Sequence, residues 1–298
     1  MQLRRWWILA AIAALALLVA ACAEDDAADD VDDADDEVEE EVDDEADEET
    51  DEETDEEADE DEAADDLGLA EEGVLVAGSN LDFEPFEFIE DGEEQGFDID
   101  LMNEIGERLG VEVEFVNSGF DTLLTQLDGG EFDAVISALT ITEERAETVD
   151  FSQPYFAANQ AMVVRADSDI AGVEDIEGRD IGVQAATTGS DYAMENFEPE
   201  AGVTEFPGTA EAFTALESDQ LDAVFIDLPV ASEQAEGSDT LELVAEVDTG
   251  EEYGIAVQMG NAALLEALDA TLAEIIEDGT YESIYSEWFE GDVPEQFQ

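Results

Sequence analysis

The feature that most constrains this chain is a block of 44 residues, Ala23 to Asp66, in which 31 residues are aspartate or glutamate. The remaining residues of the block are alanine, valine and threonine. Such a segment cannot bury enough apolar surface to offset the entropy of ordering, and its charges repel one another. We expect a disordered tether, which we place at residues 23–70, so that any folded core comes from the rest of the chain.

A leader precedes this block. Arg4 and Arg5 are followed by sixteen uncharged, mostly apolar residues and then by the only cysteine, Cys22. The run is short for a membrane span, which needs about 20 residues, and its basic start and small-residue end are typical of a secretory signal. The ending Val19 to Cys22 resembles the lipobox of bacterial lipoproteins, in which the cysteine is acylated.

We therefore expect a signal peptide at residues 1–22 and a lipid anchor at Cys22 that holds the protein to a membrane, at the cell surface or in the periplasm. The alternative is an ordinary signal or an uncleaved anchor with an incidental cysteine. Export by the general or by the twin-arginine route stays open.

The rest of the chain is also acidic. Residues 67–298 hold 57 acids and four cations, all arginine, because the chain has no lysine and no histidine. Like charges at this density destabilise a compact state at low salt, whereas about 1 M salt shortens the Debye length to about 3 Å. We interpret the composition as an adaptation to high salt. It also excludes nucleic acid and anionic membrane surfaces as partners, since both require basic patches.

The pattern of the acidic body alternates between strand and helix. Apolar runs at Gly73–Ser79 and Val111–Val116 predict strands, and the spacing of apolar residues in Gly96–Gly110 predicts a helix that ends at its final glycine. We expect Asp121 to cap a short helix, followed by a buried strand at Phe132–Ser137.

A similar unit occurs twice. The runs LDGGEFDAVISA (Leu127–Ala138) and LESDQLDAVFID (Leu216–Asp227) share a helix end, a spacing and an Asp-Ala-Val strand start. Two similar α/β lobes are implied. Because open parallel sheets bind ligands beyond the carboxyl ends of their strands, Ser137–Thr140 and Asp227 are expected at ligand-facing edges. Further strands are expected at Asp180–Ala185 and Glu252–Gln258, and further helices from Thr187 and over Ala262–Ile276.

Three motifs in order carry a specific resemblance. They are GFDIDLMNEIGERL from Gly96, ISALTITEERAETVDFSQPYF from Ile136, and EDGTYESIYSEWF from Glu277. From Gly73 to Trp288 the chain resembles the polar-amino-acid-binding proteins of ABC importers, the bacterial extracellular solute-binding family 3. The resemblance implies a type II periplasmic-binding-protein clamshell of class α/β, in which each lobe is an open sheet flanked by helices. Two crossover strands join lobe one (71–160 and 253–298) to lobe two (161–252).

A free amino acid presents a carboxylate, an ammonium and a side chain, and a site for it needs a cation, an anion and a shaped pocket. Arg145 offers a planar two-pronged donor for the carboxylate, and we expect it in the first turn of a helix started by Thr140–Glu143, where free N–H groups also favour an anion. The alternative is a surface pair with Glu143, Glu144 or Asp150.

The resemblance implies the other roles. Asp227 would bind the ammonium, Phe83 and Phe120 would sandwich the ligand's aliphatic stem, and Thr187, Thr188 and Gly189 would meet the carboxylate from lobe two. The full expected ligand-binding set is Asn80, Phe83, Phe120, Ser137, Ala138, Thr140, Arg145, Gln184, Thr187, Thr188 and Asp227. The remaining arginines of the body, Arg108, Arg165 and Arg179, are expected to be structural or solvent-facing.

Two positions depart from the family pattern. Asn80 stands where binders of glutamine or basic amino acids usually have aspartate, and Gln184 where a glutamine binder has lysine. An amide cannot neutralise a cation, so a neutral, glutamine-like ligand is expected. The partners implied are a free polar amino acid and an ABC permease, with the chain a monomer, without cofactor or metal, and not an enzyme. Two alternatives remain, namely an amino-acid sensor for a signalling partner and a cyclohexadienyl-type dehydratase on the same scaffold.

Overall fold

The computed structural model of the protein describes residues 67–197 and 201–298. The expected signal peptide, Cys22 and the acidic block therefore lie outside the described residues. Contacts of the folded body extend to its described start, because Leu67 is buried and the backbone N–H of Ala70 donates to Asp133 over 2.8 Å.

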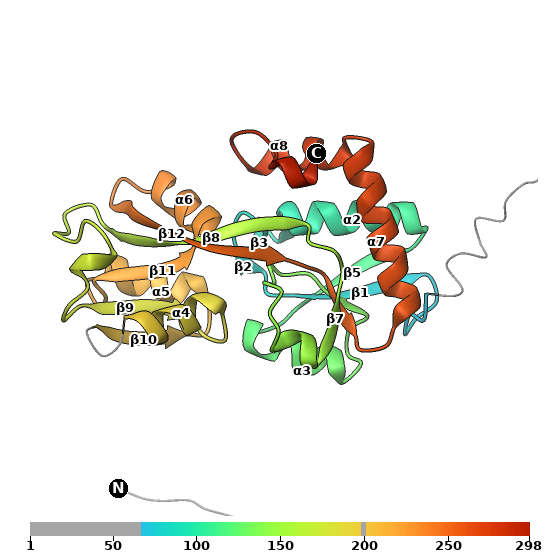
Figure 1. Ribbon diagram of the computed structural model, residues 1–298, viewed down its shortest axis with the longest axis horizontal. Helices are drawn as coiled ribbons and strands as arrows, with labels where there is room; N and C mark the ends of the chain where they lie inside the picture. The colour runs from blue at the N-terminus through green and yellow to red at the C-terminus, as the bar shows by residue number, and fades with distance from the viewer. Residues whose placement is uncertain (1–66, 198–200) are drawn as a thin grey trace, which may run out of the picture. The chain divides into compact units, whose positions relative to one another are not determined.

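Two mixed five-stranded sheets organise the body (Figure 1). In the first, β1 pairs in parallel with β5 and β6, and β13 pairs antiparallel with β6 and β7. Its strands in spatial order are β5 (Glu112–Asn117), β1 (Val74–Ser79), β6 (Ala134–Val135), β13 (Ala256–Gln258) and β7 (Val149–Phe151). Because β13 comes late in the sequence, the chain returns to this sheet after building the second one, as expected.

In the second sheet, β9 pairs in parallel with β10 and β11, and β8 pairs antiparallel with β11 and β12. Its strands in order are β10 (Gly202–Phe206), β9 (Asp180–Gln184), β11 (Ala223–Asp227), β8 (Phe156–Arg165) and β12 (Leu241–Tyr253). The long strands β8 and β12 run side by side and extend from this sheet towards the first one (Figure 1). The expected boundaries between the lobes fall within β8 and at the end of β12, and they stay a proposal.

Helices cover both sheets. On the first lobe, α2 (Phe97–Leu109), α7 (Ala262–Glu277) and α8 (Thr280–Trp288) pack together, and α3 (Leu123–Asp128) contacts β1, β6 and β13. On the second lobe, α4 (Thr188–Asn196), α5 (Thr209–Glu217) and α6 (Leu228–Glu236) contact its strands. A small sheet of β2 (Asp82–Phe83), β3 (Glu87–Glu90) and β4 (Glu93–Gln95) precedes α2. Four short 3-10 turns complete the described elements: η1 (Phe120–Thr122), η2 (Arg145–Glu147), η3 (Val173–Asp175) and η4 (Glu295–Phe297).

Helix α2 shows how local sequence sets an element. Its residues Leu101, Met102 and Ile105 are fully buried along one face. The helix ends at Gly110, whose left-handed backbone (φ 69°) lets backbone N–H groups donate to the last carbonyls of the helix. At the other end, Gly96 has φ 130°, and a Cβ there would collide with the backbone of Phe86. The start of α2 therefore requires glycine.

One expected cap is wrong. Asp121 was expected to cap the helix that contains Leu123 and Leu127, but it lies inside η1, and the residue before α3 is Thr122. The first turn is tightened because Thr122 donates its backbone N–H and its hydroxyl to the carbonyl of Gly119. These bonds leave no cap position for Asp121.

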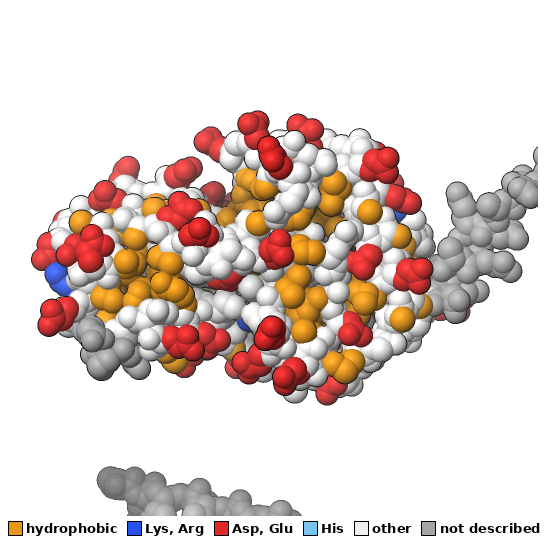
Figure 2. All heavy atoms as spheres, viewed as in Figure 1, with side chains coloured by type: hydrophobic (Ala, Val, Ile, Leu, Met, Phe, Trp, Pro, Cys, Tyr) orange, Lys and Arg blue, Asp and Glu red, His pale blue; other side chains and the backbone are white. Residues whose placement is uncertain are grey.

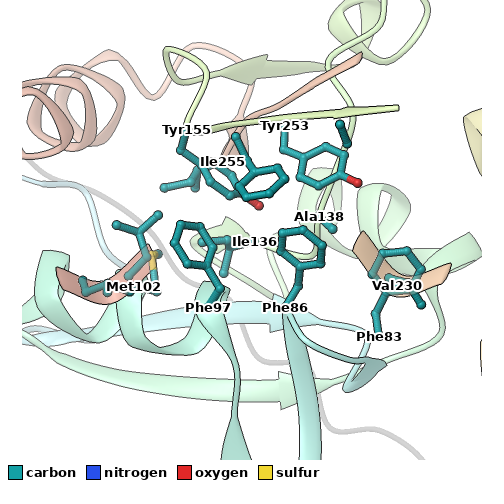
Figure 3. Packing of buried hydrophobic residues seen from close by; sticks show 14 of the residues in the cluster. Phe83, Phe86, Phe97, Met102, Ile136, Ala138, Tyr155, Val230, Tyr253 and Ile255 are labelled. Atoms are coloured by element: carbon teal, nitrogen blue, oxygen red, sulfur yellow. The ribbon is translucent and has the colours of Figure 1, made fainter. Parts of the chain in front are cut away.

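Aromatic rings fill the core where the lobes join. Phe86 and Phe97 face Tyr155 and Tyr253 (Figure 3), and the Phe86 and Tyr253 rings meet edge to face with centroids 5.4 Å apart. All four side chains are fully buried. Edge-to-face pairs at this distance stabilise packing beyond the area that they bury, so the ends of β8 and β12 are held firmly against lobe one.

Candidate functional site

A narrow cavity lies between the two lobes, and ten of the eleven expected ligand-binding residues line it. They are Phe83, Phe120, Ser137, Ala138, Thr140, Arg145, Gln184, Thr187, Thr188 and Asp227. The free space is about 10 Å³, close to the minimum of about 10–15 Å³ for one water. The lobes are therefore closed together, and an amino acid can enter only when they separate. A larger hollow of about 530 Å³ lies elsewhere, between α6 and α8.

The eleventh residue, Asn80, lies behind the cavity wall. Its side-chain oxygen accepts a hydrogen bond from the amide nitrogen of Gln184 over 2.9 Å, and its side-chain nitrogen donates to the carbonyl of Ser118 over 3.2 Å. Both ends of the Asn80 amide are thus engaged by protein groups. The bond to Gln184 also connects the two lobes.

Arg145 projects into the cavity. Its guanidinium donates to the carbonyl of Thr140 over 2.7 Å and to the carbonyl of Ala186 over 3.0 Å, and it lies 5.5 Å from the centre of the Phe120 ring. Among the described residues it forms no ion pair, whereas Arg108, Arg165 and Arg179 each do. Burial lowers the pKa of Arg145, and nearby carboxylates, Asp227 first among them, oppose this shift. The expected alternative of a surface pair is therefore not found within the described part of the chain.

The backbone around Arg145 differs from the expectation of a helix beginning at Thr140. Instead, the backbone N–H of Ile141 donates to the backbone carbonyl of Glu252 over 2.8 Å, and Thr140 forms an antiparallel β-bridge with Tyr253. These contacts hold the segment extended against β12. Only the single 3-10 turn η2 follows, and the backbone N–H of Arg145 donates to the hydroxyl of Thr142. Helix N–H groups on this side of the cavity are consequently not part of the site.

Asp227 ends β11 on the opposite lobe and is 7% exposed. Its two oxygens accept hydrogen bonds from the amide of Gln160 and from the hydroxyl of Tyr253, which lie on β8 and β12. Burial raises the pKa of Asp227 to about 7, and the charge of Glu251 adds to the shift. The strands that join the lobes therefore hold this carboxylate in place.

Glu251 is a carboxylate that sequence reasoning missed. It accepts from the hydroxyls of Thr140 over 2.8 Å and Thr188 over 2.6 Å, which come from different lobes, and from the amide of Gln160 over 3.0 Å. A hydroxyl has one proton. Because the hydroxyls of Thr140 and Thr188 both donate their protons to Glu251, their oxygens can only accept hydrogen bonds from a group in the cavity.

On lobe two, α4 begins at the cavity wall. The hydroxyl of Thr187 accepts from the backbone N–H of Ser190 over 3.1 Å, as a helix cap does. The first backbone N–H groups of a helix have no partner within it, so Thr188 and Gly189 present donors where an anion is favoured.

A pair of buried carboxyl groups supports the opposite wall. Glu87 accepts from the hydroxyl of Ser137 over 2.7 Å, and Asp98 accepts from the backbone N–H of Ala138 over 2.7 Å and from the hydroxyl of Tyr155 over 2.8 Å. Burial raises the pKa of both carboxyls, that of Asp98 to about 7 and that of Glu87 well above its usual range. A proton between them satisfies both, because two ionised carboxylates can only accept.

These supporting residues gave little signal in the sequence. Glu87 and Asp98 are two of the 57 acids of the body, and Glu251 lies in an acidic stretch of a composition typical of exposed segments. Gln160 is the exception, because it is a polar residue directly ahead of the apolar run Ala161–Val164, in a strand whose sequence is typical of a buried one.

Within the described residues, no cluster of side chains could hold a metal ion, and no helix is long and apolar enough to cross a membrane. These findings concern residues 67–197 and 201–298 alone.

Comparison with known proteins agrees with the fold and with the three sequence motifs. Residues 75–291 match the model of the bacterial extracellular solute-binding proteins, family 3. The ABC transporter glutamine-binding protein GlnH of Bacillus subtilis (strain 168) is 38% identical over 208 residues, which are 68% of this chain and 76% of GlnH.

Two solved structures are similar to the whole body. An ancestral arginine-binding protein bound to glutamine has 40% identity and a TM-score of 0.71, covering 74% of this chain and 100% of that one. The ancestral amino-acid-binding protein AncCDT-1, a precursor of cyclohexadienyl dehydratase, has 38% identity and a TM-score of 0.69, covering 73% of this chain and 96% of that one. The chain belongs to the bacterial extracellular solute-binding proteins of family 3.

Proposed function

We propose that this chain is the binding component of an amino-acid ABC importer. It captures one free polar amino acid, glutamine-like in its side chain, between its lobes and delivers it to a membrane permease. The observation that carries the proposal is that Arg145 and Asp227, which come from different lobes, line the same narrow cavity. A cation and an anion that face one cavity match the carboxylate and ammonium of a zwitterion.

The hydrogen bonds of the site support a definite orientation of the ligand. The carboxylate would meet Arg145 and the first N–H groups of α4, which are donors. The ammonium would meet Asp227 and the oxygen of Thr140, whose own proton goes to Glu251. The rings of Phe83 and Phe120 line the cavity where the aliphatic part of the side chain would lie.

A thermal-shift screen of the twenty amino acids in about 2 M KCl tests the proposal. Binding at 100 times Kd adds about 2.7 kcal/mol to the free energy of unfolding, and this corresponds to a rise in Tm of about 5–10 °C for a body of this size. We expect such a rise for glutamine or a close analogue. A flat response to all twenty would overturn the proposal.

The variant Arg145→Ala isolates the carboxylate contact. We expect its affinity for any amino acid to fall by about two decades or more, roughly 3 kcal/mol, because a buried charge partner is lost. Arg179→Ala is the matched control, since Arg179 pairs with Asp169 and Asp222 away from the cavity. Titration calorimetry that finds Arg145→Ala within threefold of the control would locate the site elsewhere.

The same proposal includes a lipid anchor at Cys22, a monomeric state and operation at high salt. These rest on the sequence. We expect Cys22→Ser to release the protein from membranes, and membrane retention of this variant without an acyl mass would refute the anchor.

Transport is favoured over catalysis by the curated relatives, because they are named as binding proteins of ABC transporters. A buried carboxyl with a raised pKa, such as that of Asp227, is nevertheless the kind of group that serves as a general acid or base. Since AncCDT-1 is described as a precursor of a dehydratase, an assay for turnover of prephenate and arogenate accompanies the binding screen. Product formation would replace the transport proposal with the enzymatic one. A sensing role would instead be recognised by co-purification of a signalling partner in place of a permease.

A further inference from the structure

The hollow between α6 and α8 has no part in the site described above. Its volume of about 530 Å³ is within the range of about 300–1,000 Å³ that is usual for small-molecule sites. It shares no lining residue with the amino-acid cavity. In Figure 1, α6 and α8 lie above the long strands β8 and β12, whereas α4, which begins at the cavity wall, lies below them. The hollow is therefore a separate feature, on the other side of the connecting strands.

Both lobes form the walls of this hollow. Lobe two contributes the face of α6 that carries Glu233 and Glu236, and lobe one contributes Pro85 and the end of α8. Between these walls lie short stretches of β8 and β12, at residues 157–159 and 250–252. A molecule held in the hollow would consequently contact both lobes and the strands that join them.

Four aromatic side chains line the lobe-one side of the hollow. They are Phe156, Tyr285, Trp288 and Phe289, and the ring centre of Phe289 lies 5.0 Å from those of both Phe156 and Tyr285. The indole N–H of Trp288 already donates to Asp100 over 2.7 Å. Because this is its one donor, its ring offers the hollow only an aromatic surface. Figure 2 shows apolar side chains gathered below α8 on this face of the molecule.

Carboxylates complete the lining, and no arginine lies among them. Five glutamates line the hollow, namely Glu233, Glu236, Glu251, Glu252 and Glu290. Beside Pro85, burial raises the pKa of Glu84, and the charge of Glu233 on the other lobe adds to this shift. Negative charge therefore faces negative charge between the lobes. Acidic side chains are spread over the visible face of the protein, so the carboxylates alone select no ligand, whereas carboxylates together with aromatic faces do.

We propose that the hollow between α6 and α8 is a second binding site, which takes a small organic cation such as a quaternary ammonium compound, and that its occupation favours the closed form. Aromatic faces attract such cations, and carboxylates complement their charge. A quaternary ammonium has no N–H group, so it loses no hydrogen bond when it enters aromatic surroundings. A hydrated metal ion would meet the carboxylates without covering the apolar surface, and a neutral molecule would leave the repulsion between the lobes in place.

The preference for the closed form depends on the two walls. A cation that contacts α6 and α8 together binds best when both are in place, and it lowers the repulsion between Glu84 and Glu233. Since an amino acid held between the lobes also requires closure, each ligand strengthens the binding of the other by the same factor. This coupling rests on the proposed function, whereas the cation site itself does not.

The fluorescence of Trp288 reports directly on the hollow. The other two tryptophans of the chain are Trp6 and Trp7, so the full chain with Trp6→Phe and Trp7→Phe has Trp288 as its one tryptophan. The probes are choline and the neutral alcohol in which a carbon atom replaces the nitrogen of choline, each titrated at a constant total salt of about 2 M. We expect a saturable change in emission, with choline binding about fivefold tighter or more than the alcohol. No response, or equal responses to both probes, would overturn the cation site.

The variant Glu233→Lys places an ammonium group in the hollow itself. We expect it to weaken choline binding by about fivefold or more, because the added cation repels the probe and occupies its space. Glu242→Lys is the matched control, since Glu242 is exposed on β12 outside the hollow and undergoes the same change of charge. Choline affinities of the two variants that agree within twofold would locate the cation elsewhere. Thermal unfolding of each variant without ligand separates loss of folding from loss of binding.

The coupling is measured by titration calorimetry with the amino acid that gives the largest thermal shift. We expect saturating choline to raise its affinity by about fivefold, and the neutral alcohol to leave it unchanged. An amino-acid affinity that choline does not alter would overturn the link to closure. If choline binds the wild type but none of the twenty amino acids does, the proposed function fails and the cation site stands.

Discussion

Asp227 links ligand binding to pH at the scale of a single residue. In the ligand-free protein, burial raises its pKa to about 7, and the charge of Glu251 contributes to this shift. A carboxyl whose folded pKa is raised contributes stability below its ordinary pKa, and this contribution is lost as pH rises through about 7. The affinity for an ammonium depends on pH in the opposite direction. It increases as pH rises, because the ligand requires the ionised carboxylate.

We therefore expect amino-acid affinity to fall as pH drops below about 7, approaching tenfold per pH unit for one proton. Titration calorimetry between pH 5.5 and 8.5, in buffers of different ionisation enthalpy, measures both the affinity and the proton released. Glu251→Gln should move the midpoint to lower pH, because the charge that raises the pKa of Asp227 is removed. Glu242→Gln, an exposed change on the same strand, is the control. A pH-independent affinity would contradict this linkage.

At the scale of an element, helix α5 of lobe two is completed by a residue of lobe one. Its N-cap residue, Gly208, provides no side chain, and the carboxylate of Asp82 on β2 accepts the backbone N–H of Ala210 over 3.4 Å. The hydroxyl of Thr209 donates to the carbonyl of Asp82. Because a capping carboxylate stabilises a helix start by about 1 kcal/mol, this contact favours the closed arrangement of the lobes.

The variant Gly208→Ala tests the contact across the lobes. A Cβ at this position would lie 2.4 Å from the carboxylate oxygen of Asp82 that accepts from Ala210, so this oxygen must turn away and the bond across the lobes is lost. We therefore expect the closed form to lose population and the affinity for amino acid to fall by about tenfold, or about 1.4 kcal/mol. Small-angle scattering should show a smaller compaction on adding ligand. Gly237→Ala, at the end of α6 with a helical backbone, is the control. Unchanged affinity and compaction would show that Asp82 and α5 do not influence closure.

At the scale of the whole molecule, surface charge governs stability. Figure 2 shows acidic side chains spread over both lobes on the visible face, with few basic ones among them. The arginines away from the cavity, Arg108, Arg165 and Arg179, are each paired with acids. Repulsion among the remaining carboxylates opposes the compact state until salt screens it.

We expect the free energy of unfolding to rise between about 0.1 M and 2 M KCl. A gain of about 2 kcal/mol would raise Tm by about 4–8 °C for a body of this size. Denaturation by urea at each salt concentration measures this directly, because urea adds no charge. A protein equally stable at both concentrations would contradict the interpretation of its composition as an adaptation to salt.

Local chemistry determined much of what the sequence could predict. The end of α2 at Gly110, the cap of α4 at Thr187 and the repeated strand that ends at Asp227 depend on residues close to one another in the chain. Propensities and caps act over such distances. The family resemblance that the three motifs carry added the order of the lobes and implied the ten residues that line the cavity.

Tertiary structure decided how those residues are used. The segment after Thr140 is extended because β12 lies against it, although its sequence favours a helix start. The polarity of Gln184 depends on Asn80 and Ser118, which are more than 60 residues away and on the other lobe. Hydrogen-bond direction and burial depend on which groups folding brings together. The sequence by itself therefore predicted ten residues that line the cavity. Only the fold placed Asn80 behind its wall, brought Glu251 to its threonines and decided which groups donate and which accept.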